Sequence, residues 1–392
     1  MISSSVSSLV VSAVSSGDVP GAVAMMGRGP AVLETVSAGY PEDTVFDLAS
    51  LTKVVATTTV TLALGIDLGA FAADFGPALS WVGVTVRHLL THTSGLPDTR
   101  KFYQWCTDRS SLLASLYSTP LVAPPGTQVT YSDLGFIALG EIVAAVAGEP
   151  LDAAVRRCVL DPLDMTSAGF ALLGQAPGIP ASPPSRFAAF PPSRFAPTTE
   201  PDTGLPPLGV VHDENARVLG GVAGHAGLFG TAADLARFAQ WWVSAAGDGP
   251  GGPVPRAMRR LATTCQTEGL DGCRGLGWTC PGDRYDILGG TWPGTSVSHT
   301  GFTGTSLALD PESGLWVVLL TNAVHYGRDA TAVKALRRAV HSAAAAAYLR
   351  LPPAGPAARR AGQPSSAIPS RATLVQRTVR PPAHGGRTGP GA

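Results

Sequence analysis

Segments with the pattern of β-strands lie near both ends of this chain, and the long stretch between them is mostly helical in pattern. Residues 22–27 and 31–37 flank an Arg-Gly-Pro turn, and residues 306–309 and 315–321 flank the turn Asp-Pro-Glu-Ser-Gly. Each pair predicts a β-hairpin. The simplest fold is therefore α+β: one antiparallel β-sheet built from both ends of the chain, flanked by N- and C-terminal helices, with a mostly helical domain inserted between them.

The length allows two or three domains, but the pattern favours one composite unit over residues 1–350. Within it, residues 1–48 and 295–350 are expected to form the sheet part, and residues 49–294 the mostly helical part. A ligand site is expected in the cleft between the two parts. Residues 174–207 are rich in proline and cannot form a regular helix or a central strand, so they are expected to be a long surface loop or lid, or to be disordered.

Charged residues make up only 14% of the chain, against 45% hydrophobic residues, and the formal net charge is zero. The balance is uneven, because residues 351–392 contain six Arg and no acidic residue. This basic tail is expected to be disordered. The rest of the chain then carries about six net negative charges, which gives no reason to expect a nucleic-acid partner.

No segment has the pattern of a membrane span or of a secretory signal. The best apolar run, residues 54–68, is short and is interrupted by threonines and Asp67. No basic residue precedes Arg28. The five cysteines are an odd number without a Cys-x-x-Cys pair, so reduced thiols in the cytoplasm are expected, with a single bridge between Cys273 and Cys280 as the less favoured alternative.

Ser50 and Lys53 lie three residues apart at the predicted start of an apolar helix. This spacing places both side chains on one helix face, within one turn. A serine hydroxyl needs a nearby base to act as a nucleophile, and a buried lysine can serve because burial lowers the pKa of its ammonium group. Only three of the 28 Lys and Arg residues are Lys, and Arg cannot act as a base. A catalytic Ser–Lys pair is one interpretation, and an ordinary helix start is the other.

A second stretch, Tyr131-Ser132-Asp133, follows a turn and precedes a predicted helix over residues 134–147. If the Tyr131 phenol lies beside Lys53, it can share the proton of the lysine, act as the base for the serine and later protonate the leaving group. The alternative is a tyrosine that only caps the helix.

A third stretch, His299-Thr300-Gly301-Phe302, is predicted on an edge strand. Because Gly301 is small, a substrate could lie against the strand edge at this point. The backbone N–H groups of Phe302 and Ser50 would then form an oxyanion hole. The alternative for His299 is a histidine at the end of a strand without a role in the reaction.

In order and spacing, these three stretches resemble the motifs of the serine β-lactamase and penicillin-binding protein superfamily, and most of all its class C β-lactamase-like branch and the related esterases. The similarity covers roughly residues 19–342 and includes flanking segments at 86–96, 220–234 and 275–278. It implies that Ser50 attacks a carbonyl while Lys53 and Tyr131 transfer the proton. It also implies that the acyl group rests on Ser50 until water or another nucleophile releases it, without a metal or cofactor.

Two residues depart from the pattern of the β-lactamases. Asp133 stands where that branch usually has Asn, and an ionised carboxylate cannot donate a hydrogen bond to the side chain of a β-lactam. His299 stands in place of a lysine that binds the carboxylate of penicillins and peptides, and histidine is largely neutral at pH 7. The preferred function is therefore hydrolysis of a small ester or amide through a Ser50 acyl-enzyme.

Three alternatives to this function stay open. One is an acyltransferase that passes the acyl group to an amine in natural-product biosynthesis. Another is a weak β-lactamase or D-Ala-D-Ala carboxypeptidase. The third is a penicillin-binding sensor that is not an enzyme. The expected partner is a small molecule, with neither nucleic acid nor membrane, and no oligomeric state is predicted.

Other candidate sites have weaker patterns. His212-Asp213-Glu214 and His225 are residues that can bind metals, but their spacing matches no recognised site, so a helix start and a loop histidine are favoured and no metal is expected. His88 and His92 are interpreted as hydrogen-bonded structural histidines near a turn.

Overall fold

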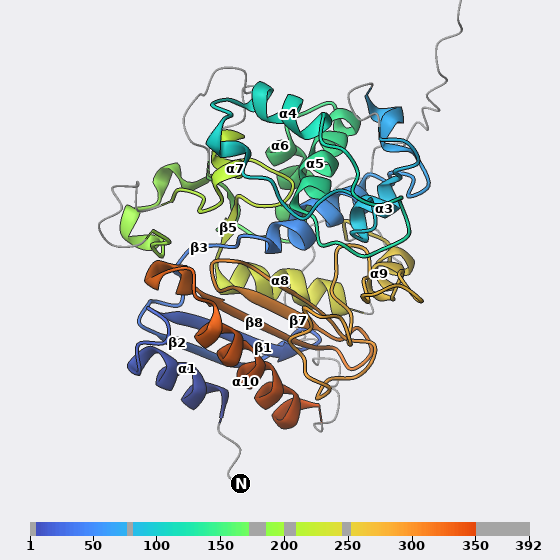
Figure 1. Cartoon of the computed structure of the whole chain (residues 1–392). Coiled ribbons are helices and arrows are strands. Elements are labelled where there is room, and N and C mark those ends of the chain that lie inside the picture. Colours follow the sequence, from blue (N-terminus) through green and yellow to red (C-terminus); the bar gives the residue numbers. More distant parts are fainter. Residues whose placement is uncertain (1–4, 77–80, 172–185, 200–208, 245–251, 350–392) are drawn as a thin grey trace, which may run out of the picture. The chain divides into compact units, whose positions relative to one another are not determined.

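A five-stranded antiparallel sheet joins the two ends of the chain in the computed structural model (Figure 1), which describes residues 5–76, 81–171, 186–199, 209–244 and 252–349. The strand order is β2–β1–β8–β7–β6. The strands are β1 (Ala22–Arg28), β2 (Ala31–Ala38), β6 (Val297–Thr300), β7 (Ser306–Leu309) and β8 (Leu315–Thr321). The β1–β8 pairing, in which Ala22 lies opposite Thr321, brings the N-terminal and C-terminal hairpins into one sheet.

Helices cover both faces of this sheet (Figure 1). The helices α1 (Val6–Ser15) and α10 (Thr331–Tyr348) pack on one face, and α8 (Ala232–Val243) packs on the other. β8 is buried on both faces, with Leu315, Val317 and Leu319 on the side of α1 and α10 and Trp316, Val318 and Leu320 on the side of α8. This double burial explains the unbroken apolar run of the strand. The predicted α+β fold with flanking terminal helices is confirmed.

The middle of the chain supplies the mostly helical part. Its helices are the π-helix η1 (Lys53–Thr58), α2 (Thr59–Ala63), α3 (Val86–Leu90), α4 (Arg109–Tyr117), α5 (Asp133–Ala147), α6 (Leu151–Val155), the π-helix η4 (Arg156–Leu160), α7 (Glu214–Val218), α8 and α9 (Arg256–Thr263). Short 3-10 turns are η2 (Ala72–Phe75), η3 (Phe102–Gln104), η5 (Arg186–Ala189), η6 (Pro192–Arg194) and η7 (Ala323–Tyr326). A small sheet has the order β3 (Phe46–Asp47), β5 (Leu228–Gly230), β4 (Gly169–Phe170).

The helix α4 covers only the second half of residues 103–117, although the whole segment has the apolar pattern of a helix. The helix α4 begins only at Arg109, because the Asp108 side chain accepts a hydrogen bond of 2.9 Å from the Ser111 N–H and caps it there. The residues before it form the 3-10 turn η3. The apolar periodicity of the segment does not distinguish these two conformations.

Residues 186–199, in the second half of the proline-rich segment predicted over 174–207, pack against the small sheet. The Val45 N–H donates to the carbonyl oxygen of Arg194 (2.8 Å), and Phe187 and Phe195 are buried against Phe229. The rest of that segment and the whole tail 351–392 lie outside the described residues. Among the described residues no single helix is long and apolar enough to cross a membrane, although α5 and residues Leu151–Leu160 together reach that length across a bend of 76°.

Candidate active site

The apolar helix that follows Ser50 is buried on every side. Three of its four threonine hydroxyls donate to backbone carbonyl oxygens: Thr59 and Thr61 within the helix, at 2.7 Å each, and Thr57 to Gly224 at 2.6 Å. The Thr58 hydroxyl has no hydrogen-bond partner among the described residues. Buried hydroxyl groups with such partners cost little free energy. The threonine-rich run therefore forms a rigid internal helix whose first turn carries the candidate nucleophile.

Ser50 follows a turn with a rarely adopted backbone conformation, because Ala49 has a φ of 47°, in the left-handed region. Side chains from two directions hold this turn. Asp47 accepts a hydrogen bond from the Ala49 N–H (2.8 Å), while Thr303 donates to the Asp47 carbonyl (2.8 Å) and Thr305 donates to the next carbonyl along the chain (3.0 Å). Both threonines lie between β6 and β7, so the sheet fixes the position of Ser50.

Gly301 packs directly against the same turn. A Cβ atom at this position would lie 2.1 Å from Thr305 Oγ1 and 2.6 Å from the carbonyl oxygen of Leu48. No side chain fits in that space. The glycine is therefore required for the contact between the third stretch and the nucleophile turn, a reason that the sequence interpretation, in which Gly301 makes room for a substrate, did not include.

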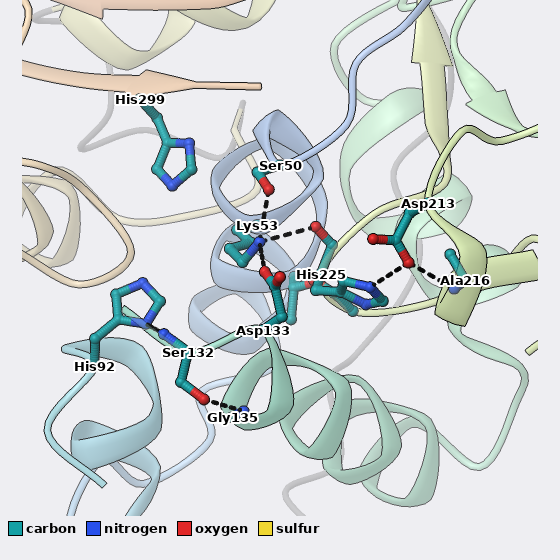
Figure 2. A network of polar contacts seen from close by, with 12 residues as sticks. Ser50, Lys53, His92, Ser132, Asp133, Gly135, Asp213, Ala216, His225 and His299 are labelled. Atoms are coloured by element: carbon teal, nitrogen blue, oxygen red, sulfur yellow. Dashed lines mark hydrogen bonds and ion pairs between the residues drawn. The ribbon is translucent and has the colours of Figure 1, made fainter. Parts of the chain in front are cut away.

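Lys53 is fully buried and lies at the centre of a polar network (Figure 2). Its Nζ donates to Ser50 Oγ at 2.8 Å and to the carbonyl oxygen of His225 at 3.1 Å, and it forms an ion pair with Asp133 Oδ1 at 2.7 Å. The predicted proximity of Ser50 and Lys53 is thus present. Asp133 was expected to face the substrate. It lines the cavity, and it is also the counter-ion of the lysine.

The charge on Lys53 differs from the sequence expectation. Burial lowers the pKa of its ammonium group, as expected, but the negative charge of Asp133 and the neighbouring Tyr131 phenol outweigh burial, and the net pKa of Lys53 lies above its usual value. The resting lysine is therefore an ammonium ion that donates to Ser50, and the expectation that it is a ready base is wrong. A proton must leave this cluster before Ser50 can lose its own.

Tyr131 lies beside both Ser50 and Lys53. Its ring centroid is 4.9 Å from Lys53 Nζ, and its hydroxyl group interacts with Lys53 and Ser50. Burial raises the pKa of Tyr131 above its usual value, with a further contribution from Asp133. The phenol is therefore protonated at rest and positioned to give a proton to a leaving group.

The segment before α5 is held by the turn that contains His92. His92 Nδ1 accepts a hydrogen bond from the Ser132 N–H (3.0 Å), and Ser132 Oγ donates to the carbonyl oxygen of Pro97 (2.6 Å). The Asp133 N–H donates to the carbonyl oxygen of Asp98 (2.8 Å). His92 is thus a structural residue, as predicted, and it fixes the direction of Tyr131 and Asp133.

His299 is the penultimate residue of the edge strand β6 and is almost fully buried, with Nδ1 3.0 Å from the carbonyl oxygen of Thr300. Burial, together with the positive charges of Lys53 and Arg274, holds its pKa well below the usual value. His299 is therefore neutral, as the sequence interpretation required. The outer edge of the strand is already paired at Ser298, which exchanges two backbone hydrogen bonds of 2.9 Å with Thr279, so a substrate can reach only the residues beyond it.

These residues meet at a cavity of about 480 Å³. Ser50, Tyr131 and Asp133 line it from the helical part, and all four residues of the third stretch line it from the sheet part: His299, Thr300, Gly301 and Phe302. The two lysines other than Lys53 also line this cavity, namely Lys101 and Lys334. The predicted site residues therefore line one cleft between the two parts, except for Lys53, which is buried behind Ser50 and contacts it.

The Asp213–His225 pair was not predicted as part of this site. Asp213 Oδ1 lies 2.8 Å from His225 Nε2 and accepts from the Ala216 N–H at 2.7 Å (Figure 2). Burial raises the pKa of Asp213, but the attraction of His225 prevails and holds it well below the usual range, so the carboxylate is ionised and His225 Nε2 carries the proton. The pair fixes the carbonyl that faces Lys53. The role of a backbone carbonyl group cannot be predicted from residue types. The sequence could have indicated only that Asp213 and His225 are residues able to form a pair.

Metal binding by these residues has no support in the structure. Within the described ranges, no group of three or more His, Cys, Asp or Glu side chains is placed to hold a metal ion. Three of the residues that the sequence offered as possible metal ligands, His212, Asp213 and His225, instead make hydrogen bonds to protein groups.

The antiparallel sheet and the inserted helical part define the class of proteins with the β-lactamase fold, and the Ser50–Lys53–Tyr131 cluster lies at its cleft. The chain belongs to the Beta-lactamase family, whose model matches residues 6–342. The superfamily that the three stretches indicated is thereby confirmed.

Two relatives illustrate the range of names in this family. A protein of Escherichia coli O157:H7 with the provisional name D-alanyl-D-alanine carboxypeptidase is 29% identical over 311 residues, which cover 72% of this chain and 70% of that protein. The N-acetylmuramyl-L-alanine amidase of Bacillus subtilis (strain 168) is 28% identical over 351 residues, which cover 78% of each chain.

Solved structures agree on the fold. EstCE1, described as a hydrolase with promiscuous acyltransferase activity, has a TM-score of 0.65 and 23% identity, with 86% of this chain and 97% of that chain covered. The simvastatin synthase LovD from Aspergillus terreus has a TM-score of 0.67 and 20% identity, with 88% and 98% covered. At these identities the similarity establishes the shared fold and no common substrate.

Proposed function

We propose that the protein is a serine acyl hydrolase that cleaves an ester or amide of a small molecule through an acyl-enzyme on Ser50. The observation that supports this most strongly is the 2.8 Å contact between Lys53 Nζ and Ser50 Oγ at the edge of a cavity of about 480 Å³. Nucleophilic catalysis requires an activated hydroxyl group and room for a carbonyl group beside it. The cleft has room beside Ser50, and the Lys53–Tyr131 cluster can activate the hydroxyl group once the cluster has lost a proton.

In the proposed reaction, Ser50 Oγ attacks the carbonyl carbon and the carbonyl oxygen becomes negative. The backbone N–H groups of Ser50 and Phe302 stabilise this oxyanion, with each donor contributing about 3 kcal/mol. Because Lys53 and Tyr131 are both protonated at rest, the reactive form is the one in which their cluster has lost one proton and can accept that of Ser50. Tyr131 then protonates the leaving group, and water releases the acyl group by the reverse path.

The charges around Ser50 favour a substrate without a carboxylate beside β6. His299 is neutral and offers no fixed cation, and Asp133 can only accept hydrogen bonds while it is ionised. Both residues suit an uncharged ester better than a penicillin. Short esters are therefore the expected substrates.

A second candidate is hydrolysis of a peptide or amide from the cell wall, for which the names of the two relatives are the motivation. One observation in the structure supports it. Lys101 and Lys334 line the cavity from opposite parts of the protein and are exposed, so either ammonium group can meet the carboxylate of a peptide. In this reading the cation for the carboxylate lies at the rim rather than on the strand.

The test is an activity panel on the wild-type protein, Ser50→Ala and the exposed control Ser118→Ala. It contains short p-nitrophenyl esters, a chromogenic β-lactam, a D-Ala-D-Ala peptide and an N-acetylmuramyl-L-alanine amide. We expect the esters to react fastest, the β-lactam slowly, and Ser50→Ala to lose all turnover while Ser118→Ala keeps it. A fluorophosphonate should label the wild-type protein once, at Ser50.

Each outcome separates the candidates. If the D-Ala-D-Ala peptide or the muramyl amide is turned over faster than any ester, the second candidate replaces the first. Adding an amine to the ester assay tests acyl transfer, because a transferase diverts the product from acid to amide. If no compound ever acylates Ser50 in the wild-type protein, the proposal of an acyl-enzyme fails, and a sensor that only binds a ligand is the remaining reading.

A further inference from the structure

Three of the five cysteines converge in one short segment at the wall of the cleft. Cys265, Cys273 and Cys280 lie within 16 residues of sequence, whereas Cys106 and Cys158 lie in the helical part. The Sγ atoms of Cys265 and Cys273 are 2.6 Å apart. The sequence interpretation had considered a bridge between Cys273 and Cys280. The Cys273 thiol does interact with Cys280, but the sulfur that lies 2.6 Å from it is that of Cys265.

Backbone pairing brings these two thiols together. The Gln266 N–H donates to the carbonyl oxygen of Arg274 at 2.7 Å, and the Arg274 N–H donates to Thr267 Oγ1 at 2.9 Å. The chain reverses between these pairs, where Gly269 and Gly272 have positive φ angles that other residues rarely adopt. Cys265 and Cys273, the residues that flank this closed loop, therefore lie side by side without any covalent bond.

The three thiols differ in their exposure to solvent and in how their S–H groups are hydrogen-bonded. Cys265 and Cys273 are partly exposed, whereas Cys280 is 3% exposed. Cys273 donates its S–H to the sulfur of Cys265, and burial together with that contact raises the pKa of Cys273. Cys273 thus keeps its proton, while Cys265 accepts the S–H hydrogen bond and is partly exposed, so Cys265 is the sulfur that meets an oxidant.

We propose that Cys265 and Cys273 are a modification site. A small-molecule disulfide such as glutathione disulfide oxidises them, and they form a reversible disulfide with each other. The Cys265 thiolate attacks one sulfur of glutathione disulfide and expels one glutathione, which leaves a mixed disulfide on Cys265. The Cys273 sulfur, after losing its proton, attacks Cys265 Sγ and expels the second glutathione. The protein loses two protons and two electrons, and one glutathione disulfide is reduced to two glutathione molecules.

The bridge would act on the residue that follows it. Arg274 is buried, donates to Thr279 Oγ1 at 2.8 Å and forms an ion pair of 2.9 Å with Asp283 Oδ1. The carbon between its guanidinium nitrogens lies 5.5 Å from the centroid of the Tyr131 ring. A disulfide at Cys273 tethers the backbone of Arg274, and with it one of the cations packed on the catalytic candidate Tyr131.

Mass spectrometry of the full-length protein tests the proposal independently of any activity. The protein is incubated with glutathione disulfide or with dithiothreitol, denatured, alkylated at the remaining thiols and digested with trypsin. Arg260 and Arg274 bound one tryptic peptide that contains both Cys265 and Cys273, whereas Cys280 lies in the next peptide. The proposed bridge therefore appears as the loss of two hydrogens within the peptide 261–274, with Cys280 alkylated. A bridge to Cys280 would instead join two peptides.

We expect three alkylated cysteines after oxidation and five after reduction, and a rise in the unfolding temperature of roughly 2–4 °C in the oxidised protein. Cys265→Ser and Cys273→Ser should abolish both effects, while Cys280→Ser and the distant control Cys158→Ser keep them. Five free thiols after prolonged oxidation, a glutathione that stays on Cys265, or a bridge to Cys280 would each overturn the proposal. Because the wild-type digest alone decides between these results, a variant that fails to fold does not weaken the test.

Discussion

Asp133 Oδ1 lies 2.7 Å from Lys53 Nζ, and this ion pair sets the protonation state of the whole site. A carboxylate in this position holds Lys53 as an ammonium ion despite its complete burial. Ser50 thus rests beside a hydrogen-bond donor instead of a base. The proposed chemistry begins only after one proton has left the cluster, so its rate must depend on pH.

Replacing Asp133 by Asn should move the pH dependence of the reaction. Asn keeps the shape of the side chain but removes the charge that stabilises the ammonium form of Lys53. The pKa of Lys53 then falls, and the reactive form is populated at lower pH. We expect the acidic limb of the kcat/KM profile for a short ester to move down by roughly 1–3 pH units. The exposed control Asp271→Asn should leave the limb in place. An unshifted limb in Asp133→Asn would show that the ion pair does not control the reactive proton.

Gly301→Ala should disable the site without removing any polar group. Its methyl group would meet Thr305 Oγ1 at 2.1 Å and the carbonyl oxygen of Leu48 at 2.6 Å, so the turn before Ser50 has to move. Overpacking of this kind costs about 1–3 kcal/mol of stability, and the displaced nucleophile should lower kcat by about 100-fold.

The matched control for this variant is Gly294→Ala, where an added Cβ meets no atom within 4 Å. Denaturant unfolding and ester kinetics on both variants provide the comparison. Equal activity in the two variants would mean that the close approach of β6 to the nucleophile turn is not needed.

Asp213→Asn should weaken the protein most at neutral pH. The folded pKa of Asp213 is lowered below its value in the unfolded chain, so its contribution to the free energy of unfolding is complete above about pH 4 and is lost as the pH falls further. The deficit of the variant relative to the wild-type protein should therefore be constant from pH 7 to 5 and shrink below pH 4. Thermal unfolding of both proteins across this range measures it, and a deficit that grows on acidification would contradict the assigned role.

His299→Lys should not convert the protein into a β-lactamase, although it restores the lysine typical of that branch. The side chain at this position is buried near the positive charges of Lys53 and Arg274, which already disfavour a protonated His299. An added ammonium group would be buried beside these two positive charges, and we expect the free energy of unfolding to fall by about 3–5 kcal/mol.

The neutral variant His299→Gln is the comparison, and it should lose less stability than His299→Lys. Urea unfolding and turnover of a chromogenic β-lactam are measured on both. A stable His299→Lys protein with faster β-lactam turnover would show that this buried position tolerates a cation beside Lys53 and Arg274.

The sequence was most informative where structure depends on neighbours along the chain. The strands 306–309 and 315–321 are found at the predicted residues because each is an apolar run that ends at a turn. The Ser50–Lys53 contact was likewise readable, since three residues in a helix fix the geometry. The protonation state of Lys53 could not be predicted from the sequence, because Asp133 lies 80 positions further along the chain and only folding brings its charge to the lysine.

Contacts made by the backbone also could not be predicted from the sequence. The carbonyl oxygen of His225 binds Lys53, yet any residue carries a carbonyl group, so nothing in the side chain marks this role. Gly301 was noticed, but its reason lies in the carbonyl of Leu48, a partner more than 250 positions away.

The hydrogen bonds from Thr303 and Thr305 to the turn before Ser50 span 256 and 257 positions of sequence. During synthesis, Ser50 therefore leaves the ribosome long before the residues that hold Ser50 in place have been made. β1 meets its partner β8 only when synthesis has passed Thr321. The growing chain carries Ser50 without the fixed turn, so acylation waits for the last strand, and fragments that end before it should be inert towards every substrate of the complete protein.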